Sequence, residues 1–218
     1  MHPHGIRFDR RTFPHSYART AAAATTHEGD PSVTTIGYIV GSISSTSLNR
    51  ALAEALAKLA PEGVEFEEIV IKDLPFYSSD YDAEFPQVGL DFKKHIESVD
   101  GIVIVTPEYN RSIPGVLKNA IEWASRPYGD FSFGDKPVAV LGGSPGAIGT
   151  AAAQQHLKAV LSHVNAIVMG QPEGFVQVTP GLIDGDGDIS NEGTKAFLQS
   201  YLDTFLGLIA RVQKAYAA

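Results

Sequence analysis

Residues 41–50 concentrate hydroxyl side chains immediately before a predicted helix, and they read Gly-Ser-Ile-Ser-Ser-Thr-Ser-Leu-Asn-Arg. Gly41 permits a tight turn, and the free N–H groups and partial positive charge of a helix N-terminus suit an anion. Together these features predict a site for one phosphate group. Ser47 could instead be an ordinary helix cap, so this alternative stays open. The chain shows no Gly-x-x-x-x-Gly-Lys-Ser/Thr pattern and no Gly-x-Gly-x-x-Gly pattern here, which argues against a triphosphate or dinucleotide cradle.

Two further segments have the composition of ligand-binding loops. Residues 106–115 read Thr-Pro-Glu-Tyr-Asn-Arg-Ser-Ile-Pro-Gly, and two prolines restrict this backbone. Tyr109 and Asn110 could meet the face and the polar edge of a flat heterocycle. Residues 142–149 read Gly-Gly-Ser-Pro-Gly-Ala-Ile-Gly, and their glycines would let a planar ring approach backbone N–H groups closely. Taken alone, each segment could also be an ordinary rigid turn.

Short β-rich runs alternate with helical patterns from residue 33 onward. The predicted strands are residues 33–40, 64–71, 101–106, 137–141 and 166–169. The predicted helices cover residues 48–59, 91–98, 114–125 and 150–163, and a last helix carries Phe197, Tyr201, Phe205, Leu208 and Val212 on one stripe.

Five strands that alternate with five helices predict an α/β fold, a three-layer, doubly wound, five-stranded parallel sheet of order 2-1-3-4-5. In such sheets ligands bind beyond the carboxyl ends of the strands, at the switch point of the strand order. The loops after the first, third and fourth strands should therefore share one mouth, where their side chains can act together.

Bulk composition narrows the classes of function. The chain has 218 residues, 44% hydrophobic and 19% charged, as expected for one globular domain. No apolar run approaches the roughly 18 residues that span a bilayer, so we predict no membrane span. The chain contains no cysteine, which excludes disulfides, thiolate nucleophiles and cysteine-based zinc sites, so redox chemistry would need a bound cofactor. A net charge of -8 argues against a nucleic-acid partner.

Residues 1–33 differ in composition from the rest of the chain. They contain four of the seven histidines and four arginines, and they show no apolar periodicity. We interpret them as a disordered or leader extension, with a start codon placed too early or a transit-type peptide as alternatives. Residues 34–218 then form one domain, and we predict a cytoplasmic location.

The three loops carry motifs that are long enough to compare with known families. They are Gly41-Ser42-Ile43-x-x-x-Ser47-x-Asn49, the run Pro-Glu-Tyr-Asn-x-Ser-Ile-Pro-Gly-x-Leu-Lys-Asn-Ala-Ile-Glu-Trp from Pro107 to Trp123, and Ser144-Pro145-Gly146-x-x-Gly149. This pattern resembles the NADPH-dependent FMN reductase family, which includes bacterial quinone, chromate and azo-dye reductases. The resemblance implies a flavodoxin-like fold, FMN as the cofactor, NADPH or NADH as co-substrate, and a homodimer or homotetramer.

The resemblance also implies which residues form the site. The FMN phosphate would contact Ser42, Ser47, Leu48 and Asn49. The flavin would lie along Pro107, Glu108, Tyr109 and Asn110, and its ring would be bordered by Ser144, Pro145 and Gly146. Beside that ring, Arg111 and Ser112 would face NAD(P)H or the acceptor, because a cation attracts the phosphates of the nicotinamide cofactor. Arg111 could also be a solvated loop arginine. We expect no catalytic side chain, since the flavin carries the chemistry, and no metal site.

One position departs from the family pattern. Family members commonly carry an arginine where this chain has Ser44, and a neutral hydroxyl makes a weaker phosphate contact than a charged group. Arg50 could compensate. We expect ping-pong transfer of a hydride from NAD(P)H through FMN to a small-molecule electron acceptor, such as a quinone, chromate, an azo compound or free flavin. The alternatives are a flavodoxin-like FMN electron carrier without NAD(P)H oxidase activity and a flavin-free scaffold.

Three other features have plainer interpretations. The aspartates at 184, 186 and 188 are spaced as in a calcium loop, but Lys195 stands where an EF-hand needs glutamate, so a polar turn is predicted. Trp123 is interpreted as a core or subunit-contact residue. His156 and His163 are placed on a helix away from the three loops, with no catalytic role.

Overall fold

The computed structural model describes residues 33–217, so the extension predicted at residues 1–33 lies outside the described residues except for Val33. Its elements, in chain order, are β1 (Thr34–Val40), α1 (Leu48–Ala57), β2 (Val64–Glu68), the short 3-10 helix η1 (Ser79–Tyr81), α2 (Gln87–Ser98), β3 (Gly101–Val105), α3 (Gly115–Ala124), β4 (Pro137–Ser144), α4 (Ala151–His163), β5 (Ile167–Val168), β6 (Gly174–Gln177) and α5 (Glu192–Tyr216).

The strands pair in parallel in the order β2-β1-β3-β4-β5, which confirms the predicted topology. Val40 at the end of β1 pairs with Val105 at the end of β3, and Val105 pairs in turn with Leu141 of β4. These strands therefore reach one edge of the sheet together. The loops that follow them begin side by side, as the alternation of strands and helices predicts.

The fifth position of the sheet is filled by two short strands instead of one. β5 pairs with the beginning of β4, and β6 pairs with its end, from Leu141↔Gly174 to Ser144↔Gln177. β5 is predicted from the sequence at residues 166–169, whereas β6 is not predicted. Pairing stops between them where Gly170 and Pro172 occur, because proline has no N–H group to donate to a neighbouring strand.

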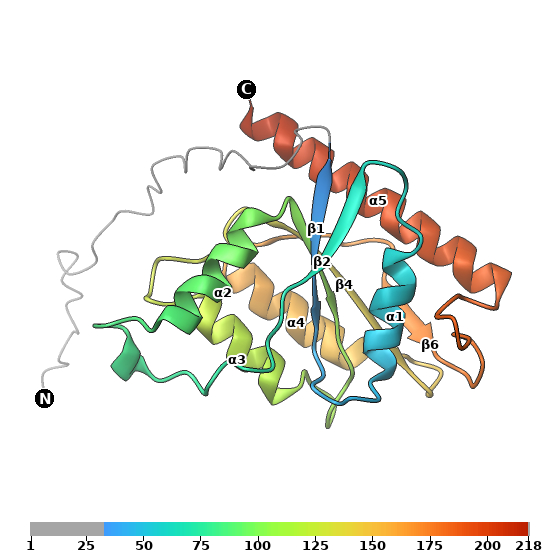
Figure 1. Cartoon of the computed structure of the whole chain (residues 1–218), viewed down its shortest axis with the longest axis horizontal. Coiled ribbons are helices and arrows are strands. Elements are labelled where there is room, and N and C mark those ends of the chain that lie inside the picture. Colours follow the sequence, from blue (N-terminus) through green and yellow to red (C-terminus); the bar gives the residue numbers. More distant parts are fainter. Residues whose placement is uncertain (1–32, 218) are drawn as a thin grey trace, which may run out of the picture.

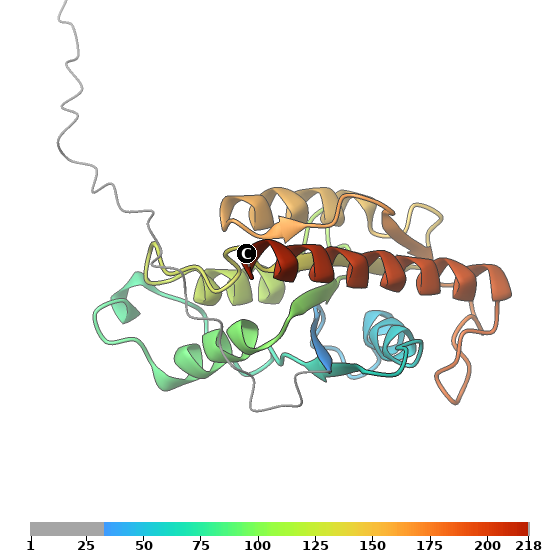
Figure 2. The ribbon, with the colours of Figure 1, turned by 90° about the horizontal axis from the view of Figure 1, so that it is seen from above.

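Alternate residues of the central strands pack against opposite layers of helices. In β3, Val103 and Val105 join the core under α1 and α5, whereas Ile102 and Ile104 join the core under α2, α3 and α4. Figure 1 shows these two sets of helices on opposite sides of the sheet, and Figure 2 shows α5 extending along the molecule. A strand covered on both faces reads as an unbroken apolar run, as β3 does.

Trp123 at the end of α3 anchors the long connection between β2 and α2. Its ring is fully buried, stacks on Tyr81 with centroids 5.4 Å apart, and donates from Nε1 to the Pro75 carbonyl at 2.7 Å. The core interpretation of Trp123 therefore fits its packing.

Within residues 33–217, no helix is both long and apolar enough to cross a membrane.

Gly142 in β4 tests how tightly the sheet packs beneath the mouth. A Cβ atom at this position would overlap the Thr150 hydroxyl and the Thr106 carbonyl oxygen. We expect Gly142→Ala to lower the free energy of unfolding by about 1–3 kcal/mol in urea titrations, because overpacking displaces backbone. Gly146→Ala is the matched control, since its Cβ would meet only Ser144 Oγ, at 3.5 Å. Equal stability of the two variants would contradict this packing.

Candidate functional site

Three loops meet at the carboxyl edge of the sheet: the first loop (residues 41–47), the second loop (residues 106–114) and the third loop (residues 145–150). Their starts are joined by backbone hydrogen bonds, from Gly41 N to Val105 O at 2.8 Å and from Thr106 N to Leu141 O at 2.9 Å. The structure therefore brings together the three segments that the sequence analysis selects, and their side chains decide what this edge can bind.

Asn49 ties the first helix to the end of β4. Its side chain is buried, donates to the Gly143 carbonyl at 3.0 Å and accepts from the Gly143 N–H at 2.9 Å. The amide therefore serves first as a link between the first turn of α1 and the end of β4. A primary amide carries two N–H groups, and the second has no acceptor among residues 33–217. A phosphate contact from Asn49 thus stays a prediction that this geometry permits.

The start of α1 offers donors to an anion. Ser47 is its N-cap, and the Ser47 hydroxyl oxygen accepts from Arg50 N at 3.3 Å. The plain capping role is therefore present, and the hydroxyl proton remains available to a ligand. In the part of the chain that the structure describes, the backbone N–H groups of Leu48 and Asn49 have no acceptor, as is usual for the first turn of a helix.

The other hydroxyls of the first loop form a local network. Ser42 is nearly buried, and its oxygen accepts from Ser44 N at 3.3 Å. Ser44 Oγ accepts from Thr46 N and lies 3.3 Å from Thr46 Oγ1. Ser44, at the position where the family pattern has arginine, therefore shapes the loop and brings no charge to it.

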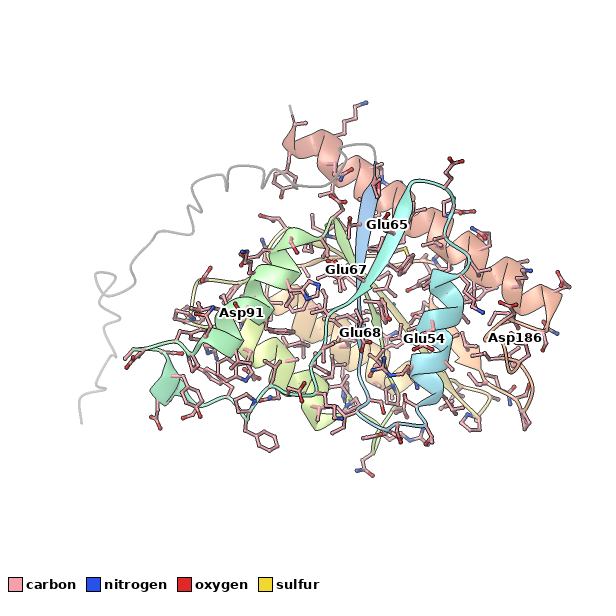
Figure 3. The ribbon with its side chains drawn as sticks, viewed as in Figure 1. Glu54, Glu65, Glu67, Glu68, Asp91 and Asp186 are labelled. Atoms are coloured by element: carbon pink, nitrogen blue, oxygen red, sulfur yellow. The ribbon has the colours of Figure 1, made fainter. Side chains whose placement is uncertain are left out.

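Arg50 lies at the edge of this loop and is held by a carboxylate. Its guanidinium forms two hydrogen bonds of 2.7 Å with Glu68, and Glu54 is 3.9 Å away. The hydrogen bond to Glu68 raises the pKa of Arg50 above its usual value. Figure 3 shows Glu54 and Glu68 between α1 and β2, with Glu65 and Glu67 along the same strand. The charge of Arg50 is thus already balanced, so its predicted compensation for Ser44 is not supported by this geometry.

A shallow cavity of about 250 Å³ lies on the β2 side of the first loop. It is lined by Val40, Ser42, Ile43, Ser44, Ser45, Arg50, Glu68, Val70, Ile71 and Lys72.

The second loop contains a two-residue hairpin turn. Tyr109 N donates to Ser112 O at 2.9 Å and Ser112 N donates to Tyr109 O at 3.0 Å. Asn110 and Arg111 between them have φ values of 52° and 65°, a left-handed conformation that asparagine tolerates and arginine adopts at a cost. The turn leaves Tyr109 half exposed and the Arg111 side chain 75% exposed, so both can meet a ligand.

Glu108 connects the second loop to α4. Its side chain is only 11% exposed, and Oε2 accepts from the backbone N–H groups of Ala152 at 3.0 Å and Ala153 at 3.2 Å. Oε1 accepts from Arg111 at 3.3 Å. The N-cap residue of α4, Thr150, makes no side-chain cap of its own. Glu108 therefore caps α4 from another loop and stabilises its N-terminus with a negative charge.

The third loop is a compact turn of small residues. The Ser144 hydroxyl donates to the Gly149 carbonyl at 2.8 Å and accepts from Gly146 N at 3.2 Å. The Pro145 carbonyl accepts from Gln177 of β6 at 3.1 Å. Gly149 has a φ of 60°, which favours glycine at this position. The predicted ring-border residues Ser144, Pro145 and Gly146 thus share one rigid turn beside the second loop.

The structure places His156 beside the second loop, contrary to the sequence analysis. Its Nδ1 atom lies 3.0 Å from Ser112 Oγ. Ala152 and His156 are four residues apart on α4 and share a face of the helix, and Ala152 is held by Glu108. This spacing is the sequence signal that places His156 near the mouth. His163, at the opposite end of α4, contacts Phe131 instead.

The aspartate-rich turn forms its bonds internally. Asp184 Oδ1 accepts from the backbone N–H groups of Asp186 and Asp188, both at 2.9 Å, and Lys58 pairs with Asp188 at 3.1 Å. The hydrogen bond from the Asp188 N–H is the largest of the causes that lower the pKa of Asp184. Among the described residues, no group of histidine, cysteine, aspartate and glutamate side chains could hold a metal ion.

Comparison with known proteins gives consistent matches. The family model of NADPH-dependent FMN reductases matches residues 34–179. The chain is 49% identical over 170 residues to a 2-hydroxy-1,4-benzoquinone reductase of Burkholderia sp., covering 78% of this chain and 93% of that protein. It is 38% identical over 179 residues to a quinone reductase of Escherichia coli (strain K12), and the match covers 80% of this chain and 95% of that protein.

A solved structure agrees with these relatives. The flavoenzyme FerB of Paracoccus denitrificans, an NAD(P)H:(acceptor) oxidoreductase, superposes with a TM-score of 0.79 at 45% identity. The superposition covers 82% of this chain and 98% of FerB.

The cap that Glu108 places on α4 can be tested by its effect on stability. We expect Glu108→Ala to lower the free energy of unfolding by about 1–2 kcal/mol, because two helix N–H groups lose their acceptor. Glu108→Gln should lower the free energy of unfolding by a smaller amount, since its amide oxygen still accepts hydrogen bonds. Glu62→Ala, at an exposed position, is the control and should stay within about 0.5 kcal/mol of the parent protein. If urea titrations show no loss of stability in Glu108→Ala, then Glu108 does not stabilise the N-terminus of α4.

Proposed function

The chain belongs to the NADPH-dependent FMN reductase family, and from this membership we propose that it transfers electrons from NAD(P)H through bound FMN to quinone acceptors. It is an NAD(P)H-dependent, FMN-containing oxidoreductase of the quinone reductase type. Quinones are the principal acceptor class because the relatives that it matches at 38–49% identity are named for quinones. Chromate, azo compounds and free flavin are further acceptors in the proposal.

The observation that carries the proposal is the open N-terminus of α1. Three helix N-termini follow the loops of the mouth, those of α1, α3 and α4, and α3 begins after the apolar pair Ile113 and Pro114. At α4, the Glu108 carboxylate already occupies the free N–H groups. At α1, the N–H groups of Leu48 and Asn49 have no acceptor among residues 33–217, and the hydroxyl residues Thr46 and Ser47 directly precede them. The residues present therefore fit the phosphate of FMN at α1, where helix amides and the hydroxyls of Ser42 and Ser47 would hold it.

The flavin ring would then extend from α1 across the second and third loops. FMN, when bound, supplies the redox chemistry by accepting a hydride from the nicotinamide and passing it to the acceptor. Pro107, Tyr109 and Asn110 would lie along the ring, and Ser144, Pro145 and Gly146 would border it. Glu108 contributes by holding α4 against the second loop.

The donor and the acceptor would use the same exposed face in turn. Arg111, which projects from the hairpin turn, would attract the phosphates of NAD(P)H. Ser112 lies beside it and offers a hydroxyl to either substrate. The loops fix these groups so that the reacting atoms can meet, which is the protein's contribution to the rate. Assembly as a homodimer or homotetramer remains a prediction from the family resemblance, and a cytoplasmic location remains a prediction from the sequence.

An acceptor assay separates this enzyme from an FMN electron carrier. We expect FMN-loaded protein to oxidise NADPH or NADH when benzoquinone is added, with parallel lines in double-reciprocal plots, because the two substrates bind in turn. Absorbance at the nicotinamide band measures the rate. FMN binding without NAD(P)H oxidation would indicate the carrier instead, and intersecting lines would exclude the ping-pong order. Protein that binds no FMN would be a scaffold.

A further inference from the structure

His156 and Ser112 form a contact between α4 and the second loop. His156 Nδ1 lies 3.0 Å from Ser112 Oγ, and the His156 side chain is exposed on the second turn of α4. Ser112 closes the hairpin turn that carries Arg111. The pair therefore joins a group that can exchange protons with solvent to a hydroxyl at the mouth of the site.

The surrounding structure fixes this contact. Glu108 accepts hydrogen bonds from Ala152 and Ala153 in the first turn of α4. Ala152 and His156 stand four residues apart, so they lie one above the other on the same helix face. The carboxylate that anchors α4 thus also holds His156 toward Ser112.

The charged groups near His156 come from three parts of the chain. The second loop contributes Glu108 and Arg111, which pair with each other at 3.3 Å. On α4 itself, Lys158 pairs at 3.4 Å with Glu173 of the connection between β5 and β6. The strands β4 and β5, which lie under α4, carry no charged residue. Histidine is the side chain that changes charge near neutral pH, and none of these neighbours is a histidine.

The proposed reaction requires a proton that the hydride does not supply. Conversion of a quinone to a hydroquinone takes two electrons and two protons. The hydride delivers both electrons and one proton to one end of the quinone. The oxygen at the other end is left with a negative charge, and it must receive the second proton from solvent or from the protein.

We propose that His156 supplies this second proton through the hydroxyl of Ser112, an inference that rests on the proposed function. The Ser112 O–H bond breaks as a new O–H bond forms on the quinone oxygen. The proton on His156 Nδ1 passes at the same time to Ser112 Oγ and restores the hydroxyl. His156 is left neutral and takes a proton from water before the next turnover. Ser112 touches the acceptor, and His156 is a positioning and proton-supplying residue that acts through it.

The test compares two acceptors that differ in their need for a proton. Benzoquinone takes up protons on reduction, whereas ferricyanide takes up one electron and no proton. Both are supplied in turn to FMN-loaded wild-type protein, His156→Gln, Ser112→Ala and His163→Gln, with NADPH as donor, across pH 5 to 9. Glutamine at 156 can still bond to Ser112 but cannot titrate, and His163→Gln changes the same residue type at the far end of α4.

We expect the ratio of the quinone rate to the ferricyanide rate to fall at least about tenfold in His156→Gln and in Ser112→Ala, because an acid catalyst is lost. His163→Gln should keep the wild-type ratio. In wild-type protein the quinone rate should fall as the pH rises, and this decline should be absent in His156→Gln.

Two results would overturn the inference. One is a His156→Gln protein with the wild-type ratio and pH profile, and the other is an equal loss with both acceptors, which indicates a purely structural role. Wild-type protein that oxidises NADPH with neither acceptor contradicts the proposed function itself, and the inference with it.

Discussion

The site depends on two hydrogen bonds between the Asn49 side chain and the backbone of Gly143. They fix the first turn of α1 against the end of β4, so that the start of α1 and the start of the third loop keep a fixed spacing. Glu108 makes the corresponding link between the second loop and α4. Backbone groups buried at the edge of a sheet need such partners, and here the same bonds that satisfy them also bring the three loops together.

The distribution of charge determines where an anion can bind. The chain has a net charge of -8, and Arg50, a cation at the edge of the first loop, is held by Glu68. At α4 the helix N-terminus is neutralised by Glu108. Among the described residues, the first N–H groups of α1 keep no acceptor, and position 44 brings a serine to the loop before them instead of an arginine. Helix amides also hold the pyrophosphate in the glycine-rich loop of dinucleotide-binding folds, where the helix N-terminus supplies the donors.

The strand order and the three loops could be predicted because they follow from the alternation of strands with helices and from the apolar pattern of each strand. β6 was missed because its four residues have no period of their own and pair only where β4 continues past β5. The contacts of Asn49, Glu108 and His156 depend on how α1 and α4 are rotated against the loops, and a single sequence does not specify that rotation. The motif match selects Glu108 as a site residue but does not reveal that it acts through a helix cap.

The affinity ratio for FMN and riboflavin measures phosphate binding at the first turn of α1, because the two ligands differ only in the phosphate. If the first turn of α1 binds that phosphate, fluorescence titration of the flavin-free protein should show FMN at least about 100-fold tighter than riboflavin, as expected from two hydrogen bonds to a charged group. Equal affinities for the two ligands would show that the first turn of α1 does not bind the phosphate.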